Sequence, residues 1–193
     1  MFKRLFSIVV LSILSALSIS AQASPFSYQE FTLGSEAVSI TGSTGTLNAF
    51  GIGATFPIRE QIFITARYAT GSGTIDALEM KVNGTALGMG AQLRIAESTD
   101  LVAGGYLSTG SQGLSAGGMS TSVSSVSETL YVGFRTLVTQ MVELNGYYHL
   151  SRTGNSSSQI GGRYYFNNGF GITAGVATSD TVQSGALGIV VAY

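Results

Sequence analysis

The strongest constraint on this chain is a two-residue alternation of apolar with small or polar side chains, repeated in segment after segment. In TALGMGAQLRI (85–95), leucine, methionine and isoleucine fall on one face, and Gly88, Gly90, Gln92 and Arg94 fall on the other. Successive side chains of a β-strand point to opposite sides of the sheet, so this period indicates strands. The same pattern recurs in 47–56, 130–138, 142–151 and 184–193. The sequence therefore predicts an all-β protein.

Breaks in the alternation divide the chain into about ten strands, and merging the weakest of them would leave eight. The ten are expected at 27–38, 45–57, 61–71, 84–96, 100–110, 127–138, 142–153, 158–166, 169–179 and 184–193. An extra hairpin within 75–89 is an alternative, because Asn83-Gly84 is a favoured turn dipeptide.

The expected connections alternate in length. Four are short, at 57–60, 97–99, 139–141 and 167–168. The segments 72–83 and 111–126 are longer, polar, and rich in Gly, Ser and Thr, which is typical of loops. Because up-and-down strands place every second connection at the same end, we expect one end with tight turns and one with long loops. Transmembrane barrels show this asymmetry.

Residues 1–23 have the pattern of a cleaved export signal. Lys3 and Arg4 precede an apolar stretch, and Ala21-Gln22-Ala23 is a small-x-small cleavage site. The alternative is an N-terminal membrane anchor, for which the stretch is short. We therefore expect a signal peptide at 1–23 and one domain at 24–193. No later segment has the continuous apolar run of a transmembrane helix.

Composition suggests which face of the strands is inside. Only 10% of the 193 residues are charged, 26 are glycine, and Lys81 is the sole lysine after the leader. Soluble domains carry about 25% charged residues, and lysine commonly protects the edges of soluble sheets. An apolar face against lipid and a small, polar face around a narrow lumen would explain both observations. Only a closed barrel leaves no unpaired strand edge in hydrocarbon. The sequence thus predicts a transmembrane antiparallel up-and-down β-barrel; the alternative is a secreted soluble β-protein.

The whole chain resembles the small outer-membrane β-barrels of Gram-negative bacteria, the class of OmpA's transmembrane domain and OmpX. The resemblance rests on the leader, on alternating strands such as TALGMGAQLRI and QIGGRYYF, and on the C-terminal LGIVVAY. In such barrels an alternating last strand ending in an aromatic residue is recognised by the barrel-assembly machinery. The positions matching that signal are Leu187, Ile189, Val191 and Tyr193, with Tyr where Phe is commoner. The resemblance implies an outer-membrane location, contact with lipid and lipopolysaccharide, and transient binding to the assembly machinery.

Aromatic residues gather near the expected short-turn end. Those assigned to the outward face are Phe56, Phe166, Phe170 and Tyr193, and Phe26 and Tyr28 lie at the same level at the start of the first strand. Aromatic residues form girdles at membrane interfaces, although they also favour strands in general.

Charged side chains are expected inside the barrel. The alternation turns a set of charged side chains inward: Glu30, Glu36, Arg67, Arg94, Arg135, Glu143 and Arg163. All except Arg67 and Glu36 lie close to short turns, so they are expected in one layer near that end. Arg135 and Glu143 are expected to be near-opposite neighbours across the turn 139–141. Such residues could form an Arg/Glu network that plugs the lumen, or a charged constriction in a narrow pore.

Other chemistries find little support. The chain has no Cys, which excludes disulfides and thiol chemistry, and one His, which leaves no transition-metal cluster. A net charge of −1 and two lysines argue against nucleic-acid binding, and no phosphate-binding loop occurs. His149 and Ser151 share a strand face, as in some lipid A-modifying hydrolases. Glu143, however, lies roughly 20 Å along the strand from His149, too far to orient the imidazole. No cofactor, metal site or enzyme activity is expected.

The sequence therefore predicts a monomeric outer-membrane barrel with a structural or surface-interaction role, whose segments 72–83 and 111–126 could bind an extracellular ligand. A narrow porin-like diffusion channel is the alternative, and a lipid A-modifying hydrolase is a distant third.

Overall fold

The computed structural model describes residue 26 and residues 28–116, 119–152, 155–167 and 169–192. The expected signal peptide at 1–23 lies outside the described residues. Within the described part of the chain, no helix is long and apolar enough to cross a membrane.

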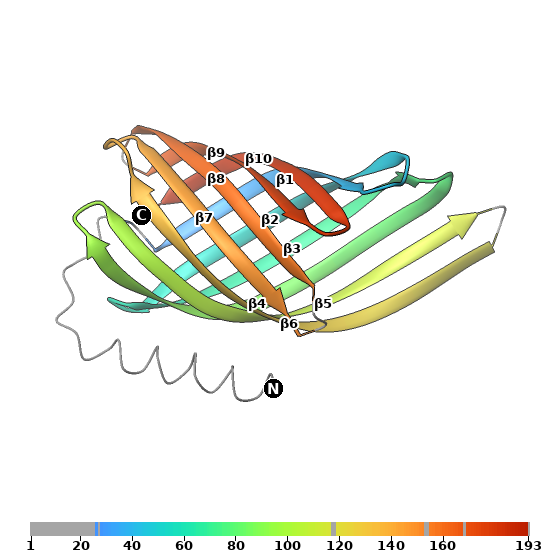
Figure 1. Ribbon diagram of the computed structural model, residues 1–193, viewed down its shortest axis with the longest axis horizontal. Helices are drawn as coiled ribbons and strands as arrows, with labels where there is room; N and C mark the ends of the chain where they lie inside the picture. Colours follow the sequence, from blue (N-terminus) through green and yellow to red (C-terminus); the bar gives the residue numbers. More distant parts are fainter. Residues whose placement is uncertain (1–25, 27, 117–118, 153–154, 168, 193) are drawn as a thin grey trace.

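Ten antiparallel strands close into a barrel (Figure 1). Each strand pairs with its neighbours in sequence, and β1 pairs with β10 to close the ring. The count of ten and the up-and-down order are as predicted. The strands are β1 (Glu30–Ile40), β2 (Gly45–Arg59), β3 (Ile62–Ile75), β4 (Leu78–Ala96), β5 (Thr99–Ala116), β6 (Met119–Leu137), β7 (Val142–Ser151), β8 (Ser156–Asn167), β9 (Phe170–Ser179) and β10 (Val182–Ala192).

The segments 72–83 and 111–126 were wrongly predicted to be loops. Residues 72–75 and 78–83 extend β3 and β4, and the described residues of 111–126 extend β5 and β6. Their Ser, Thr and Gly content resembles that of a loop, but each backbone finds a ladder partner in the adjacent strand. The resulting hairpins reach well beyond the shorter strands at that end (Figure 1).

The turn between β3 and β4 falls at Asp76 and Ala77, which have positive φ values of 50° and 65°. Positive φ at both central residues is the requirement of a two-residue type I′ hairpin turn. Asn83-Gly84, the alternative turn, lies instead within β4, where Asn83 is paired with Thr70 and Ser111.

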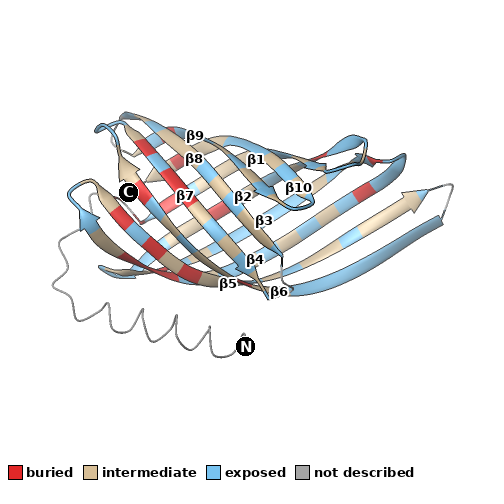
Figure 2. Cartoon of the chain, viewed as in Figure 1, coloured by how far each residue is buried: buried red, intermediate tan, exposed pale blue. Residues whose placement is uncertain are grey.

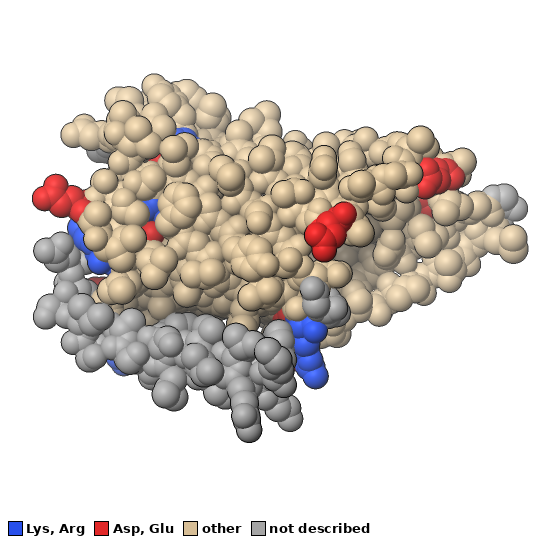
Figure 3. Space-filling view, in the orientation of Figure 1, with Lys and Arg blue, Asp and Glu red and all other residues tan. Residues whose placement is uncertain are grey.

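The two faces of the wall differ as the alternation predicts. Apolar side chains on the outward positions are exposed, including Phe50, Leu87, Val132, Ile160 and Leu187. The charged residues in the body of the barrel occupy inward positions: Glu30, Glu36, Arg67, Arg94, Asp100, Arg135, Glu143 and Arg163. A broad uncharged band covers the visible face, between charged side chains at its left end and those in its right half (Figure 3).

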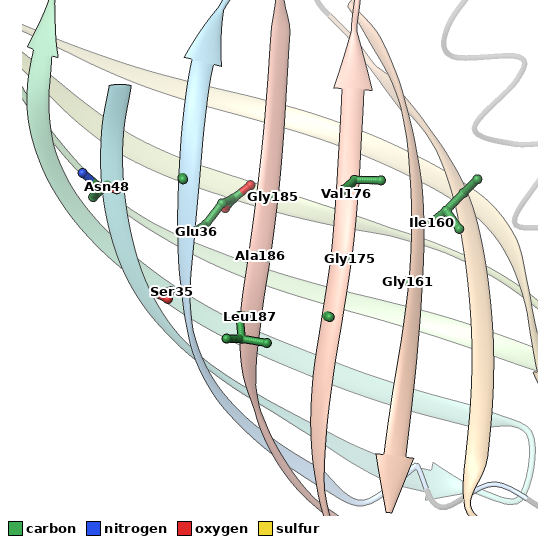
Figure 4. Close-up of a pocket in the computed structure, with 12 residues that line it drawn as sticks. Ser35, Glu36, Asn48, Ile160, Gly161, Gly175, Val176, Gly185, Ala186 and Leu187 are labelled. Carbon is green, nitrogen blue, oxygen red and sulfur yellow. The ribbon is translucent and has the colours of Figure 1, made fainter. Parts of the chain in front are cut away.

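One part of the outer wall is thin. A shallow groove of about 500 Å³ crosses β8, β9, β10 and β1, where Gly161, Gly175 and Gly185 carry no side chain. Ile160, Val176 and Leu187 come from three successive strands around it (Figure 4). The surroundings are mostly apolar, so this part of the wall keeps the character of the uncharged band.

Candidate functional site in the barrel lumen

Buried residues concentrate at one end of the barrel, on the side where the C-terminus lies (Figure 2). This is the end of the tight turns between β2 and β3, β4 and β5, β6 and β7, and β8 and β9. The most deeply buried side chains there include charged ones, with Glu143 exposed by 1% and Asp100 by 0%. Buried charges require partners, and these partners define the candidate site.

Arg135 is the centre of this site. Its Nε donates a hydrogen bond to Glu143 Oε1 at 2.9 Å, and its Nη2 donates to Glu143 Oε2 at 2.8 Å. The same Nη2 donates to Glu30 Oε1 at 2.7 Å, across the lumen on β1. A guanidinium fork matches a carboxylate in this two-bond arrangement, which fixes both direction and distance.

Arg163 on β8 completes the cluster. Its Nη1 donates to Glu30 Oε1 at 2.8 Å and lies 3.5 Å from Glu143 Oε1. The hydroxyl of Tyr165 donates to Glu143 Oε2 at 3.2 Å. Two arginines and two glutamates from β1, β6, β7 and β8 therefore balance in charge. We call Glu30, Arg135, Glu143 and Arg163 the lumen quartet.

Arg135 and Glu143 meet across the short turn, as predicted for near-opposite neighbours, although their backbones are not in direct register. Arg135 is paired with Asn145, and Glu143 with Leu137. The turn is longer than expected because β6 ends at Leu137 and β7 begins at Val142. The two residues are thus diagonal neighbours, a spacing that long side chains can span.

Arg94 lies apart from the quartet and faces a residue that sequence reasoning missed. Its Nε is 3.6 Å from Oδ1 of Asp100, directly opposite on β5. The Asp100 side chain is fully buried, and its Oδ2 accepts a hydrogen bond from the Tyr28 hydroxyl at 3.3 Å. The signal was present in the sequence, since Asp100 shares parity with Gly104 and Tyr106 on the inward face.

Phe26 and Tyr28, which were expected at the level of the girdle, lie inside the barrel and not on its outer face. Both are buried, with exposures of 8% and 6%, and pack with Phe63 and Val102 inside the barrel. The guanidinium carbon of Arg135 lies 4.8 Å from the Phe26 ring centre and 4.6 Å from that of Tyr28. Cation–π contact with Arg135 stabilises both rings in these interior positions.

Other members of the predicted girdle lie on the outer face. Phe56, Phe166 and Phe170 are exposed by 49%, 52% and 42%, and Phe166 stacks on Phe170 with ring centres 5.9 Å apart. Tyr164 meets Phe166 edge to face at 5.4 Å. Tyr193 lies outside the described residues.

The C-terminal strand follows the predicted alternation where it is described. Leu187 is exposed by 62%, Ile189 and Val191 are half-buried, and the intervening Val190 is fully buried on the inner face. The role of Leu187, Ile189, Val191 and Tyr193 in assembly remains a prediction.

Arg67 faces the lumen as predicted, but the structure does not bring it into the quartet. It is exposed to the interior space, directly opposite Gly53 and Ala86, and forms no ion pair with any described residue. It lines the same interior cavity as Tyr131 and His149.

His149 and Ser151 share the inward face but are not arranged around a carboxylate. The His149 ring lies among Tyr106, Tyr131 and Tyr147, with centre distances of 6.2, 5.9 and 6.2 Å. The Ser151 hydroxyl exchanges a hydrogen bond with Ser127 at 3.0 Å. Among the described residues, no group of three or more His, Cys, Asp and Glu could hold a metal ion.

No protein-family model matches the chain, and no curated protein matches it. Solved structures with a similar barrel include the attachment invasion locus protein Ail of Yersinia pestis, at 14% identity over 86% of this chain and 97% of that one, with a TM-score of 0.44. The translocator domain of autotransporter NalP from Neisseria meningitidis is 12% identical over 100% of this chain and 96% of its own, with a TM-score of 0.48. Neisserial surface protein A is 14% identical over 85% and 95%, with a TM-score of 0.47. All three are outer-membrane barrels of Gram-negative bacteria, as is the class that the sequence resembles.

Proposed function

We propose that this protein is an integral outer-membrane barrel with a structural or surface-interaction role, closed to solute flow by the lumen quartet. The closed ring of strands leaves no unpaired edge within the uncharged band, as a span of hydrocarbon requires. The exposed apolar residues and the aromatic cluster at the short-turn end have the distribution of a lipid-facing surface.

The observation that carries the closure is the arrangement around Arg135. Its guanidinium contacts carboxylates on both sides of the lumen, Glu30 on β1 and Glu143 on β7, and both aromatic rings of Phe26 and Tyr28. Its side chain is exposed by only 4%. A solute passing this level would have to break hydrogen bonds between buried charges, which are strong and costly to leave unmatched.

Conductance across a planar lipid bilayer tests this proposal. We expect the purified wild-type protein to give no stable conductance steps, and Arg135→Ser to give them, because the central side chain is removed. The double change Arg135→Gln/Glu143→Gln removes one charge of each sign and is a second route to an open lumen should Arg135→Ser fail to fold. Arg152→Gln is the control, since Arg152 is exposed at the opposite rim.

A narrow porin-like channel remains the alternative function. It would be supported by wild-type steps whose size Arg135→Ser leaves unchanged, which would contradict closure by the quartet. An interior cavity of about 510 Å³ adjoins the quartet and favours keeping this alternative in the test.

A further inference from the structure

The walls of the interior cavity beside the quartet differ in bulk. On β5, β6 and β7 the rings of Tyr106, Tyr131, Tyr147 and His149 project inward, and successive ring centres lie about 6 Å apart. The facing wall carries glycines on β1, β2 and β10 at Gly34, Gly51 and Gly188, which are neighbours in the sheet. Between the aromatic rings on one wall and the glycines on the other lies a space of about 510 Å³. We call the space lined by Arg67, Tyr106, Tyr131, Tyr147 and His149 the tyrosine chamber.

The tyrosine chamber contains polar groups without partners. His149 Nδ1 is buried and has no hydrogen-bond partner among the described residues. The Arg67 guanidinium has no ion pair with any described residue either, although it lines the same cavity as Tyr131 and His149. Polar groups in an enclosed space are normally matched by a partner, whether protein, water or ligand.

The charge in the tyrosine chamber is positive at Arg67. Arg135 and Arg163 also border the cavity, but Glu30 and Glu143 neutralise them. The remaining acidic group, Glu36, lies further along β1: Arg67 is at the level of Gly53 and Thr32, four residues before Glu36. Four strand residues span roughly 13 Å. A ligand at Arg67 would therefore meet an uncompensated cation.

A second cavity lies beside the tyrosine chamber, toward the end with the long hairpins. This cavity, of about 300 Å³, shares Tyr106 and His149 with the chamber. Its other lining groups are largely hydroxyls, among them Thr129, Ser156 and Ser184, and it contains no charged residue. On this side of the lumen an anionic solute would meet hydroxyl groups, whereas Glu36, on β1, also faces the lumen toward the long hairpins.

We propose that the tyrosine chamber binds a small organic carboxylate. The carboxylate pairs with Arg67, and an apolar ring fills the space between the tyrosines and the glycine wall. Ligand pockets are typically 300–1,000 Å³, mostly apolar, with a few polar groups that fix orientation. The single guanidinium suits one carboxylate, and the aromatic wall gives the body of the ligand a surface on which to stack. Binding does not require the quartet to close the lumen, so this proposal stands apart from the proposed function.

Titration of the folded, untagged full-length protein in zwitterionic detergent tests this inference. His149 is the only histidine, so its ring carbon–proton NMR signal reports on the tyrosine chamber alone. Sodium benzoate is the probe, and benzamide is its uncharged counterpart of the same shape. We expect a saturable shift of the His149 signal with benzoate and a response at least tenfold weaker with benzamide.

Arg67→Gln should raise the benzoate dissociation constant about tenfold or more, because it removes a hydrogen bond between charged groups. Arg152→Gln removes an exposed arginine at the rim and should leave the constant unchanged. Ala186→Phe, which places a ring on the inward face of β10 where Ala186 lines the cavity, should abolish binding by filling the space. Because the chain has no Trp, tyrosine fluorescence gives a second readout of the same titrations.

Three results would overturn the inference. The first is the absence of a saturable shift with benzoate. The second is equal binding of benzoate and benzamide, which would remove the role of charge. The third is unchanged binding in a folded Arg67→Gln protein, which would place the ligand elsewhere.

Discussion

Arg135 and Glu143 meet through two hydrogen bonds of 2.9 and 2.8 Å although their backbones are two residues out of direct register. The same Arg135 Nη2 that donates to Glu143 also donates to Glu30 on the far side of the ring, at 2.7 Å. One guanidinium thus joins β6 to both β7 and β1, which are not adjacent to each other.

Glu143→Gln should destabilise the barrel by about 3–5 kcal/mol, because it leaves a buried arginine with an incomplete set of carboxylates. Adding Arg135→Gln should recover part of that loss. Chemical unfolding in detergent micelles, analysed as a double-mutant cycle, measures both effects.

The exposed pair Arg152–Glu128, whose Nη1 and Oε1 atoms lie 3.1 Å apart, is the matched control. Its cycle should give less than about 1 kcal/mol. Equal coupling energies for the two pairs would contradict the burial of the quartet.

Leu187→Arg should cost about 2–4 kcal/mol in a liposome, because it places a cation on the outer face near the middle of β10. Ala186→Arg, one residue away on the inner face and opposite Glu36, should cost much less. Comparison of the unfolding free energies of these two proteins tests the assignment of the faces. The reverse order would mean that the apolar face is not the one in lipid.

Hydrogen exchange should distinguish the extended hairpins from loops. In β5, residues 109–115 are paired with both β4 and β6, so their amides should exchange slowly throughout. The described pairing of β6 with β7 ends at Thr129, so residues 120–127 have only β5 beside them. In an antiparallel pair, hydrogen bonds to one neighbour come from alternate residues. We therefore expect alternately slow and fast amides over 120–127; uniformly fast exchange across 111–126 would indicate a loop.

Asp76, at the tip of the β3–β4 hairpin, should confer a pH dependence on that tip. Its Oδ1 accepts hydrogen bonds from the backbone N and the hydroxyl of Thr44 at 2.7 and 3.1 Å. The backbone hydrogen bond from Thr44 is the main cause that lowers the pKa of Asp76 in the folded protein. A lowered pKa means that the contribution to stability is present above the unfolded pKa and is lost as the pH falls through the folded pKa.

NMR titration of the Asp76 carboxyl should therefore give a midpoint below the ordinary value of about 3.9. The Thr44 amide should lose protection over the same pH range. Asp76→Asn, which keeps the acceptor oxygen but cannot ionise, should remove this dependence. A midpoint at or above the ordinary value would show that the contact with Thr44 is absent in solution.

The sequence was sufficient to predict the barrel because alternation is a local property. Phe50, Leu87 and Val132 on one side, and Arg135, Glu143 and Arg163 on the other, could be assigned from parity alone. The ends of the strands could not be assigned in this way. Ser and Thr in 111–126 are compatible with either a loop or a ladder, and the partner strand decides between them.

Contacts across the lumen were also beyond a local pattern. Arg94 was expected in one layer with Glu30 and Glu143, without a named partner. It faces Asp100, because the pairing of β4 with β5 places that carboxylate directly opposite. Phe26 and Tyr28 precede the first strand, where parity gives no information. Inside the barrel, both rings contact the Arg135 guanidinium. The isolation of Arg67 depends on the distances between strands that are far apart in the chain.

The pairing of β1 with β10 has a consequence for how the ring can form. Every other strand pair joins neighbours in sequence, so hairpins can assemble locally, whereas this last pairing must bring together the two ends of the domain. Glu30 lies on β1, and its two ion-pair partners, Arg135 and Arg163, lie on β6 and β8. Until β1 is in place, two arginines share the single carboxylate of Glu143 in the interior. Closing the ring and neutralising its interior are therefore one event, and an intermediate with nine strands would retain an excess positive charge that the complete barrel does not have.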